Sequence, residues 1–164
     1  MEVLLHNATP ADFDSIARIS VTAYKEYATL LTAENWQKME QNLFNVAQTA
    51  DTANFVVARV EDNIVGAVAY YPPGKSNSEY FSDRWASLRL LAVAVNYRGQ
   101  GIGKLLAQAG IERAKRDNAQ GIGLYTSEAM TTAQKMYAKM GFKRDRELPS
   151  MLGLRYWLYL LPIT

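Results

Sequence analysis

Apolar side chains recur at helical spacing in the first third of the chain. Residues 3–5 are short and apolar enough for a first strand, and Thr9-Pro10 then supplies an N-cap residue and a proline at the first helical position. The sequence therefore predicts two amphipathic helices after this strand, with a turn at 51–54 behind them. Their apolar positions are Phe13, Ile16, Ala17, Tyr24 and Tyr27 in the first helix and Trp36, Met39, Leu43 and Val46 in the second.

The middle of the chain changes to a β pattern. Residues 55–60 and 64–71 are β-rich and flank a three-residue turn, which predicts a hairpin. The polar residues 75–84 favour a surface loop. Residues 88–95 are apolar except for Arg89, which is typical of a strand covered on both faces. We expect this strand to be the central one of a sheet.

A glycine-rich turn leads from this strand into a third helix, whose apolar face is predicted from the spacing of Ile102, Leu105, Leu106 and Ala109. A short strand at 122–125 and a fourth helix over 129–140 follow, and Gly141 ends that helix as a C′ glycine does. Residues 152–161 predict one or two closing strands. The sequence contains no internal repeat, so residues 1–164 predict one α/β domain.

Composition removes several classes of function. The chain has 164 residues, 49% of them hydrophobic, which is enough for one buried core. With no cysteine and one histidine, thiolate chemistry and Cys-ligated zinc are excluded, and a His-based metal site or a Ser-His-Asp triad is hard to build. A net charge of +2 with interspersed signs disfavours nucleic acid as a partner. The opening residues lack a signal-peptide pattern and no apolar run is long enough for a membrane span, so we expect a cytoplasmic protein with no metal.

The glycine-rich turn is the most informative motif. Arg98-Gly99-Gln100-Gly101-Ile102-Gly103-Lys104 lies between a buried strand and a helix, where glycines allow close backbone approach and a helix N-terminus favours an anion. It therefore suits a phosphate or pyrophosphate. A Walker A loop and a dinucleotide fingerprint both fit poorly, because Leu105 follows Lys104 and Lys104 occupies the place of the third glycine.

The pattern that remains is Arg-x-x-Gly-x-Gly, preceded by Leu91-Ala92-Val93 and followed by Ala133-x-x-x-Tyr137-x-x-x-Gly141-Phe142. Together with the two early helices and the hairpin, it resembles the coenzyme A pyrophosphate loop and late helix of the GNAT (GCN5-related N-acetyltransferase) family. The resemblance covers almost the whole chain. It implies a mixed, mostly antiparallel sheet flanked by helices, and direct transfer of an acetyl group from acetyl coenzyme A to a primary amine.

The resemblance also assigns roles to residues. It implies that the strand carrying Leu91-Ala92-Val93 splays from the next strand, and that the Val93 backbone N–H faces the acetyl carbonyl. It matches Tyr137 to the tyrosine that protonates the departing thiolate. The implied site for acetyl coenzyme A or coenzyme A consists of Leu91, Ala92, Val93, Arg98, Gly99, Gln100, Gly101, Ile102, Gly103 and Lys104.

The general base is not fixed by the resemblance, because the central strand contains no carboxylate. Candidates are Glu79 first, then Glu128, Glu26, a relayed water and His6. Met130 also departs from the family, since many members have an asparagine there that hydrogen-bonds the cofactor. The hydroxyl groups of nearby residues could make this hydrogen bond instead, and these residues are Thr126, Ser127 and Thr131.

The resemblance implies that a small-molecule or peptide amine binds between the first two helices, the hairpin and the late strands, where aromatic side chains could hold a cation. The aromatic candidates are Tyr24, Tyr27, Trp36, Tyr70, Tyr71, Tyr80 and Trp85. The alternative function is an acyl coenzyme A sensor of the same fold with weak catalysis, and a nucleotide-dependent oxidoreductase is disfavoured by Lys104. The apolar run 156–161 suggests a homodimer.

Overall fold

The computed structural model describes residues 1–45 and 54–163. The predicted helical position Val46 and most of the predicted turn at 51–54 lie outside these ranges. The described elements, in chain order, are β1 (Leu4–Asn7), α1 (Phe13–Tyr24), α2 (Ala33–Phe44), β2 (Asn54–Val60), β3 (Asn63–Tyr71), β4 (Trp85–Val93), α3 (Ile102–Arg116), β5 (Gly121–Ser127), α4 (Thr131–Lys139), β6 (Lys143–Met151) and β7 (Leu154–Pro162). Short 3-10 segments at Pro10–Asp12, Lys25–Leu30 and Val95–Tyr97 complete the pattern.

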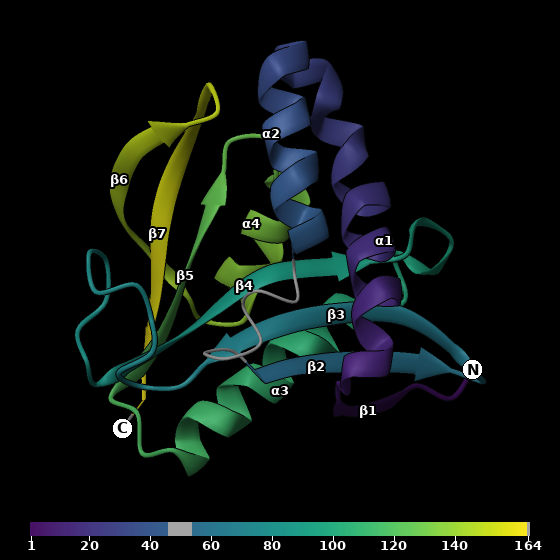
Figure 1. Cartoon of the computed structure of the whole chain (residues 1–164). Helices are drawn as coiled ribbons and strands as arrows, with labels where there is room; N and C mark the ends of the chain where they lie inside the picture. The colour runs from purple at the N-terminus through teal and green to yellow at the C-terminus, as the bar shows by residue number, and fades with distance from the viewer. Residues whose placement is uncertain (46–53, 164) are drawn as a thin grey trace.

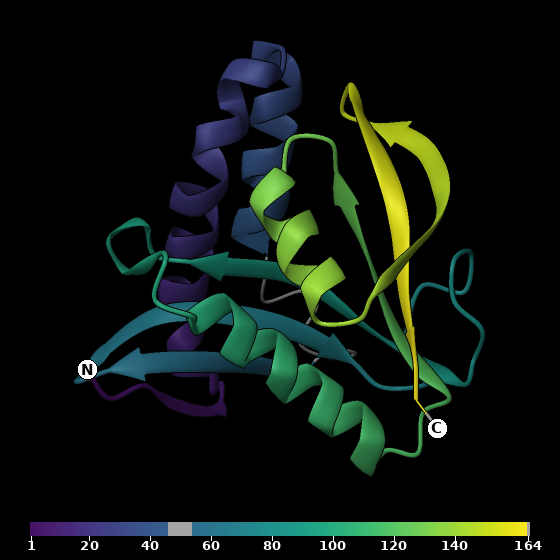
Figure 2. The same cartoon turned by 180° about the vertical axis from the view of Figure 1, so that it is seen from behind.

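The seven described strands form one sheet in the order β1-β2-β3-β4-β5-β7-β6 (Figure 1). Neighbouring strands are antiparallel except for β4 and β5, which are parallel. Helices α1 and α2 cover one face of the sheet, and α3 and α4 cover the other (Figures 1 and 2). The prediction of a mixed, mostly antiparallel sheet flanked by helices is confirmed.

Two buried clusters hold these layers together. On one face, Leu88 of β4 packs with Leu106 and Ile111 of α3. On the other face, Ile16 of α1 packs with Val57 of β2. Because β2, β3 and β4 are covered on both faces, their sequences are nearly continuous apolar runs.

The central strand begins three residues earlier than the apolar run predicted, at Trp85 rather than Leu88. These extra residues, Trp85 to Ser87, are the ones that pair with β5. The indole ring of Trp85 lies over Gly121, where an added Cβ would come within 2.4 Å of the ring. Contact between strands therefore extends β4 beyond what its own hydrophobic pattern indicates.

The closing hairpin is longer than predicted, because β6 contains the charged sequence that follows Gly141. Of its nine residues only Leu148 is buried. This edge strand therefore lacks the alternating hydrophobic pattern from which a strand is predicted. Strand β7 lies between β5 and β6, and Tyr156, Leu158 and Tyr159 are buried within the chain. The apolar run 156–161 thus packs inside the protein, and a homodimer through it stays a prediction.

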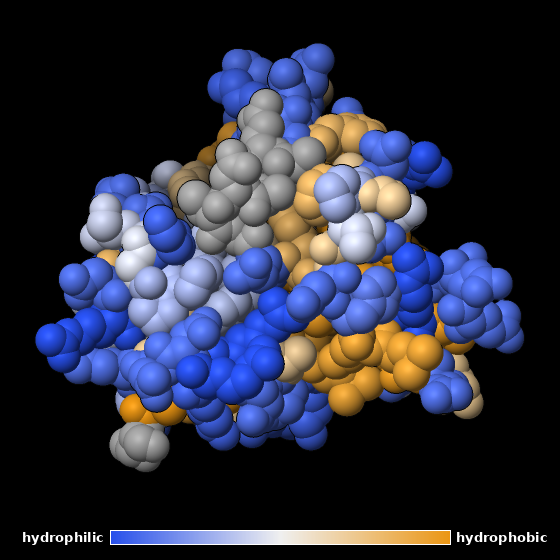
Figure 3. All heavy atoms as spheres, turned by 60° about the horizontal axis from the view of Figure 1, so that its bottom comes forward, coloured by the Kyte–Doolittle hydropathy of each residue, from blue (hydrophilic) through white to orange (hydrophobic). Residues whose placement is uncertain are grey.

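The face of the molecule that lies at the bottom of Figure 1 is largely hydrophilic, and hydrophobic residues gather in one part of it (Figure 3). Large apolar side chains exposed on the edge strand β1 are Leu4 and Leu5. Among the described residues, no helix is both long and apolar enough to cross a membrane.

Candidate active site

The site begins where β4 and β5 separate. The two strands pair from Trp85 with Gly121 to Ser87 with Gly123, and no further pairs follow among the described residues. Beyond that point β4 continues alongside β3 and β5 continues alongside β7. The divergence is visible in Figures 1 and 2. From Leu91 to Val93, the edge of β4 on the β5 side therefore has no paired strand among the described residues.

A bulge sets the direction of the backbone groups on this edge. The pairing of β3 with β4 shifts between Ala67 and Ala69, and Leu90 has a φ of 60°. After the bulge, the Ala94 N–H donates to the Val65 carbonyl of β3 at 2.8 Å. Because backbone groups alternate in direction along an antiparallel strand, the Val93 N–H points away from β3 and toward β5.

A cavity of about 510 Å³ occupies this place. It is lined by the end of α1, the second half of β4, the glycine-rich turn, the end of β5 and one face of α4. Nine of the ten residues predicted to bind the cofactor line it, and Gln100 does not. Tyr137 lines it as well, so the two ends of the family pattern meet around one volume, of a size typical for ligand sites.

The glycine-rich turn has the shape that a phosphate group needs. Gly99 and Gly101 have φ values of 75° and 83°, and a Cβ built on either would have no other atom within 4 Å. Gly101 is the N-cap of α3, and the first turn of that helix contains no acidic residue. The open space, the free helix N-terminus and Lys104 beside it fit the pyrophosphate of coenzyme A.

Arg98 is engaged by the neighbouring helix. Its guanidinium donates to the Glu26 carboxylate at 2.5 Å and to the Ala23 carbonyl at 3.0 Å. This contact ties the glycine-rich turn to the end of α1. The anion-binding capacity of the turn therefore rests on its backbone N–H groups and on Lys104 more than on Arg98.

Tyr137 presents a buried phenol to the cavity. The side chain is 5% exposed, and its ring packs edge-on against Phe142 with centroids 5.5 Å apart. Burial raises the pKa of the Tyr137 hydroxyl above its ordinary value. The hydroxyl group therefore keeps its proton to a higher pH than an ordinary tyrosine does.

Met130 is partnered by one of the hydroxyls that were considered as substitutes for the missing asparagine. The Thr126 hydroxyl donates to the Met130 sulfur at 3.2 Å, and the Ser127 hydroxyl accepts the Ala129 N–H at 3.3 Å. Thr126 and Met130 line the cavity, whereas Ser127 and Thr131 do not. Thr126 is thus the hydroxyl of this group that remains within reach of a ligand.

The structure separates the candidates for the general base. Glu26 lines the cavity and is paired with Arg98. Glu79 is exposed in the loop before β4, where its N–H donates to the Asn77 side chain, and it does not line the cavity. Glu128 is also outside the lining and accepts the Arg155 N–H at 2.6 Å.

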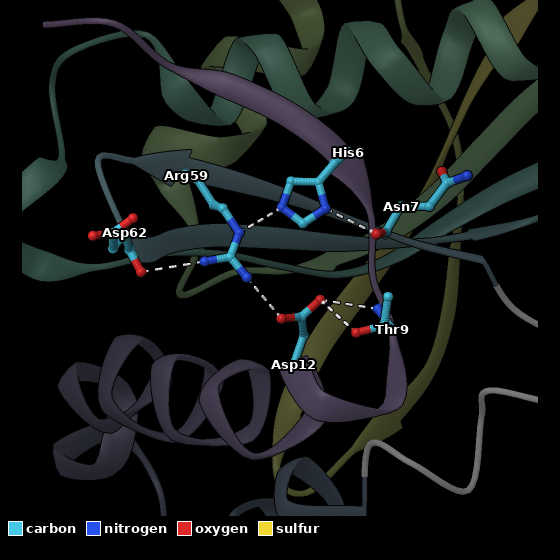
Figure 4. A network of polar contacts seen from close by, with 6 residues as sticks. All are labelled: His6, Asn7, Thr9, Asp12, Arg59 and Asp62. Carbon is cyan, nitrogen blue, oxygen red and sulfur yellow. Dashed lines mark hydrogen bonds and ion pairs between the residues drawn. The ribbon is translucent and has the colours of Figure 1, made fainter.

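His6 belongs to a different network (Figure 4). Its Nε2 accepts a hydrogen bond from Arg59 at 2.7 Å, and Arg59 also pairs with Asp12 at 2.9 Å. Asp12 in turn accepts the Thr9 N–H at 2.9 Å. These contacts join β1, β2 and the start of α1, and His6 does not line the cavity.

Two of the seven predicted acceptor aromatics, Tyr24 and Tyr27, line the cavity. Tyr70 instead donates to Asp117 at 2.7 Å. Sequence reasoning missed Arg89 and Tyr125, which do line it. The available signal was Arg89 itself, the single charge within the apolar run of β4.

Comparison with known proteins gives the class of this protein. The model of the acetyltransferase (GNAT) family matches residues 15–142, and the chain belongs to that family. An N-acetylaspartate synthetase from Xenopus tropicalis is 37% identical over 89 residues, which are 54% of this chain and 30% of that protein. An N-alpha-acetyltransferase 30 from Schizosaccharomyces pombe is 37% identical over 71 residues, 43% of this chain and 44% of that protein.

Solved structures show the same fold. The PaiA N-acetyltransferase from Thermoplasma acidophilum, crystallised with coenzyme A, has a TM-score of 0.74 at 16% identity and covers 96% of this chain and 98% of its own. The chain spans about a third of the length of the first curated relatives it matches.

Proposed function

We propose that this protein is an N-acetyltransferase that moves an acetyl group from acetyl coenzyme A to a primary amine by direct attack. The observation that carries the proposal is the cavity at the β4–β5 divergence. The cavity is lined by the glycine-rich turn, by the part of β4 beyond its pairing with β5, and by Tyr137. The absence of cysteine from the sequence fits a transfer with no acyl-enzyme intermediate.

Each of these groups has a distinct part in the proposed reaction. Acetyl coenzyme A, when bound, supplies an activated acetyl thioester. The Val93 N–H donates to the carbonyl oxygen where negative charge develops, and Tyr137 gives a proton to the departing sulfur. A carbon–nitrogen bond forms and a carbon–sulfur bond breaks, while the amine loses one proton and the sulfur gains one.

An alkylamine is mostly protonated at neutral pH, so the ammonium must first lose a proton before the free amine attacks, in addition to the proton that the nitrogen loses when the amide forms. Glu79 is retained as a proposed base only through intervening water, since it lies outside the cavity. Glu26 lies on the cavity wall but is held by Arg98. A relayed water, taking the proton to bulk solvent, suits this geometry best.

The acceptor is proposed to be an amine on an amino acid or a peptide. The names of two relatives support this, since one is an N-acetylaspartate synthetase and another an N-alpha-acetyltransferase. A cytoplasmic location and a single domain over residues 1–164 remain predictions.

The first test is thermal unfolding with coenzyme A, acetyl coenzyme A and NAD in parallel. A ligand at about 100 times its dissociation constant adds roughly 2.7 kcal/mol, which raises the midpoint of a domain of this size by roughly 5–10 °C. We expect a shift with the coenzyme A species alone, followed by thiol release that depends on an added amine. Coenzyme A binding without amine-dependent turnover would instead indicate an acyl coenzyme A sensor.

A further inference from the structure

Arg89 is a cavity-lining cation that the proposed reaction does not use. Its guanidinium lies 5.8 Å from the ring centroid of Tyr125 and 6.0 Å from that of Tyr71. It therefore sits between side chains of β3 and β5, on the same β4 strand as Val93. Among the residues that the structure describes, Arg89 takes part in no ion pair.

The other charged side chains that line the cavity are Glu26, Arg98 and Lys104. Glu26 and Arg98 neutralise each other at 2.5 Å, and Lys104 stands in the first turn of α3. Arg89 thus gives its part of the cavity a positive charge that no lining carboxylate balances. The chemistry that complements it is an anion.

The position of Arg89 separates that anion from the phosphates of coenzyme A. Arg89 lies before Val93 on β4, and the glycine-rich turn lies beyond Val93. Its positive charge acts to lower the pKa of the Tyr24 and Tyr125 hydroxyls, against the larger rise that burial causes. The charge is therefore felt at the tyrosine-lined part of the cavity, away from the glycine-rich turn.

We propose that the acceptor amine carries a carboxylate, and that Arg89 binds it while the amine faces the Val93 edge of β4. A guanidinium presents a planar fork of N–H donors that matches both oxygens of a carboxylate, which an ammonium cannot do. The rings of Tyr71 and Tyr125 lie near the guanidinium and leave its N–H donors available to a ligand. Amines that carry a second positive charge are repelled. This inference rests on the proposed function.

The test compares amines that differ only in the carboxylate. The pairs are L-phenylalanine with L-phenylalaninamide, and a tripeptide amide beginning with aspartate with the one beginning with asparagine. Spermidine serves as the cationic acceptor. The amide of an amino acid has the more acidic ammonium and hence more free amine at neutral pH, so a preference for the acid must come from binding.

For the wild-type protein we expect kcat/KM to be about 10- to 100-fold higher for the carboxylate member, mainly through KM. Arg89→Gln should bring the ratio close to one, and Arg89→Lys should leave an intermediate ratio because it keeps the charge without the fork. Arg84→Gln, an exposed arginine just before β4, is the matched control and should keep the wild-type ratio. The midpoint shift caused by coenzyme A should be the same in all four proteins.

The phenylalanine pair tests binding of an α-carboxylate, and the tripeptide pair tests binding of a carboxylate on the first side chain. Turnover without a preference for the acid in any pair, or a preference that survives in Arg89→Gln, overturns the inference and leaves the proposed function intact. That first outcome is decided on the wild-type protein, so it holds even if a variant does not fold. Binding of coenzyme A without turnover of any amine overturns the proposed function, and the inference with it.

Discussion

The Tyr24 hydroxyl donates a hydrogen bond to the carbonyl oxygen of Leu91 at 3.0 Å. It joins the last residue of α1 to the bulged part of β4, where the strand has left β5. Arg98 makes a similar connection from the glycine-rich turn to the Ala23 carbonyl. The end of α1 is thus hydrogen-bonded both to β4 and to the glycine-rich turn, two segments that line the cavity.

Tyr24→Phe removes the hydrogen bond and keeps the ring. The Leu91 carbonyl then lacks its partner, so we expect a loss of about 0.5–1.5 kcal/mol and a fall in the unfolding midpoint of a few degrees. Affinity for acetyl coenzyme A should also fall, because the edge of β4 loses a constraint. Tyr80→Phe is the control, since it removes a hydroxyl outside the cavity. Equal midpoints for the two variants would show that the Tyr24 contact does not stabilise the site.

Tyr137→Phe removes the proposed proton donor. We expect kcat to fall by about 10²–10⁴-fold, the range for general acid–base catalysis, with the dissociation constant for coenzyme A nearly unchanged. Burial raises the pKa of this hydroxyl, so it stays protonated beyond the ordinary tyrosine range. The wild-type rate should accordingly show no loss from Tyr137 ionisation up to about pH 9. A variant with wild-type kcat would remove Tyr137 from the mechanism.

Local pattern predicted much of the fold because most elements have one dominant face. The β2–β3 hairpin was predicted from two β-rich runs around a turn, and helix α3 from the spacing of its apolar positions. The predicted three-residue turn is wrong, because Asn63 pairs with Val60 and leaves a turn of two residues, and Leu105 of the predicted α3 face is exposed. Strand β6 was not separately identified, because its charged residues face solvent at the sheet edge. Strand β4 was predicted too short because Ser87 is a buried polar residue whose place depends on β5.

The site was predictable only where a motif is contiguous. The glycine-rich turn was singled out from its local sequence, and Tyr137 was assigned through the resemblance of the pattern Ala133-x-x-x-Tyr137-x-x-x-Gly141-Phe142 to the GNAT family. The pairing of Arg98 with Glu26 joins residues 72 positions apart, and Arg89 meets Tyr125 because β4 and β5 are neighbours in the sheet. Such contacts arise from tertiary structure, and no local pattern indicates them.

Alkaline pH should weaken the fold through six tyrosines whose pKa values are raised, of which Tyr24, Tyr70 and Tyr137 are examples. Burial raises the pKa values of Tyr24, Tyr70 and Tyr137 above the ordinary value. Below about pH 10 these groups are protonated in both states and add no pH dependence; above it they ionise in the unfolded chain first, so stability falls as pH rises. We expect the urea midpoint to be lower at pH 11 than at pH 9, with a smaller drop in Tyr70→Phe. A drop of the same size in Tyr70→Phe would assign the effect to other groups.

Asp12 should matter for stability and not for cofactor binding. Its side chain is 7% exposed, accepts the Thr9 N–H and pairs with Arg59 at 2.9 Å (Figure 4). Asp12→Asn keeps the shape and loses the charge, so we expect a cost of about 1–3 kcal/mol in urea unfolding. Asp14→Asn, an exposed neighbour, is the control and should change little. Weaker coenzyme A binding by a folded Asp12→Asn protein would contradict this separation.

Lys104 and Arg98 should contribute unequally to coenzyme A binding. Both line the cavity at the glycine-rich turn, but Arg98 is engaged by Glu26 and Ala23, whereas Lys104 forms no ion pair among the described residues. Lys104→Gln should therefore raise the dissociation constant for coenzyme A by about two- to fivefold at low salt. The effect should shrink at high salt, because an exposed charge is screened. Lys115→Gln, at the other end of α3, is the matched control.

Glu26→Gln releases Arg98 and should leave coenzyme A affinity unchanged or tighter. Weaker binding in Glu26→Gln would mean that the ion pair itself holds the turn in its binding shape.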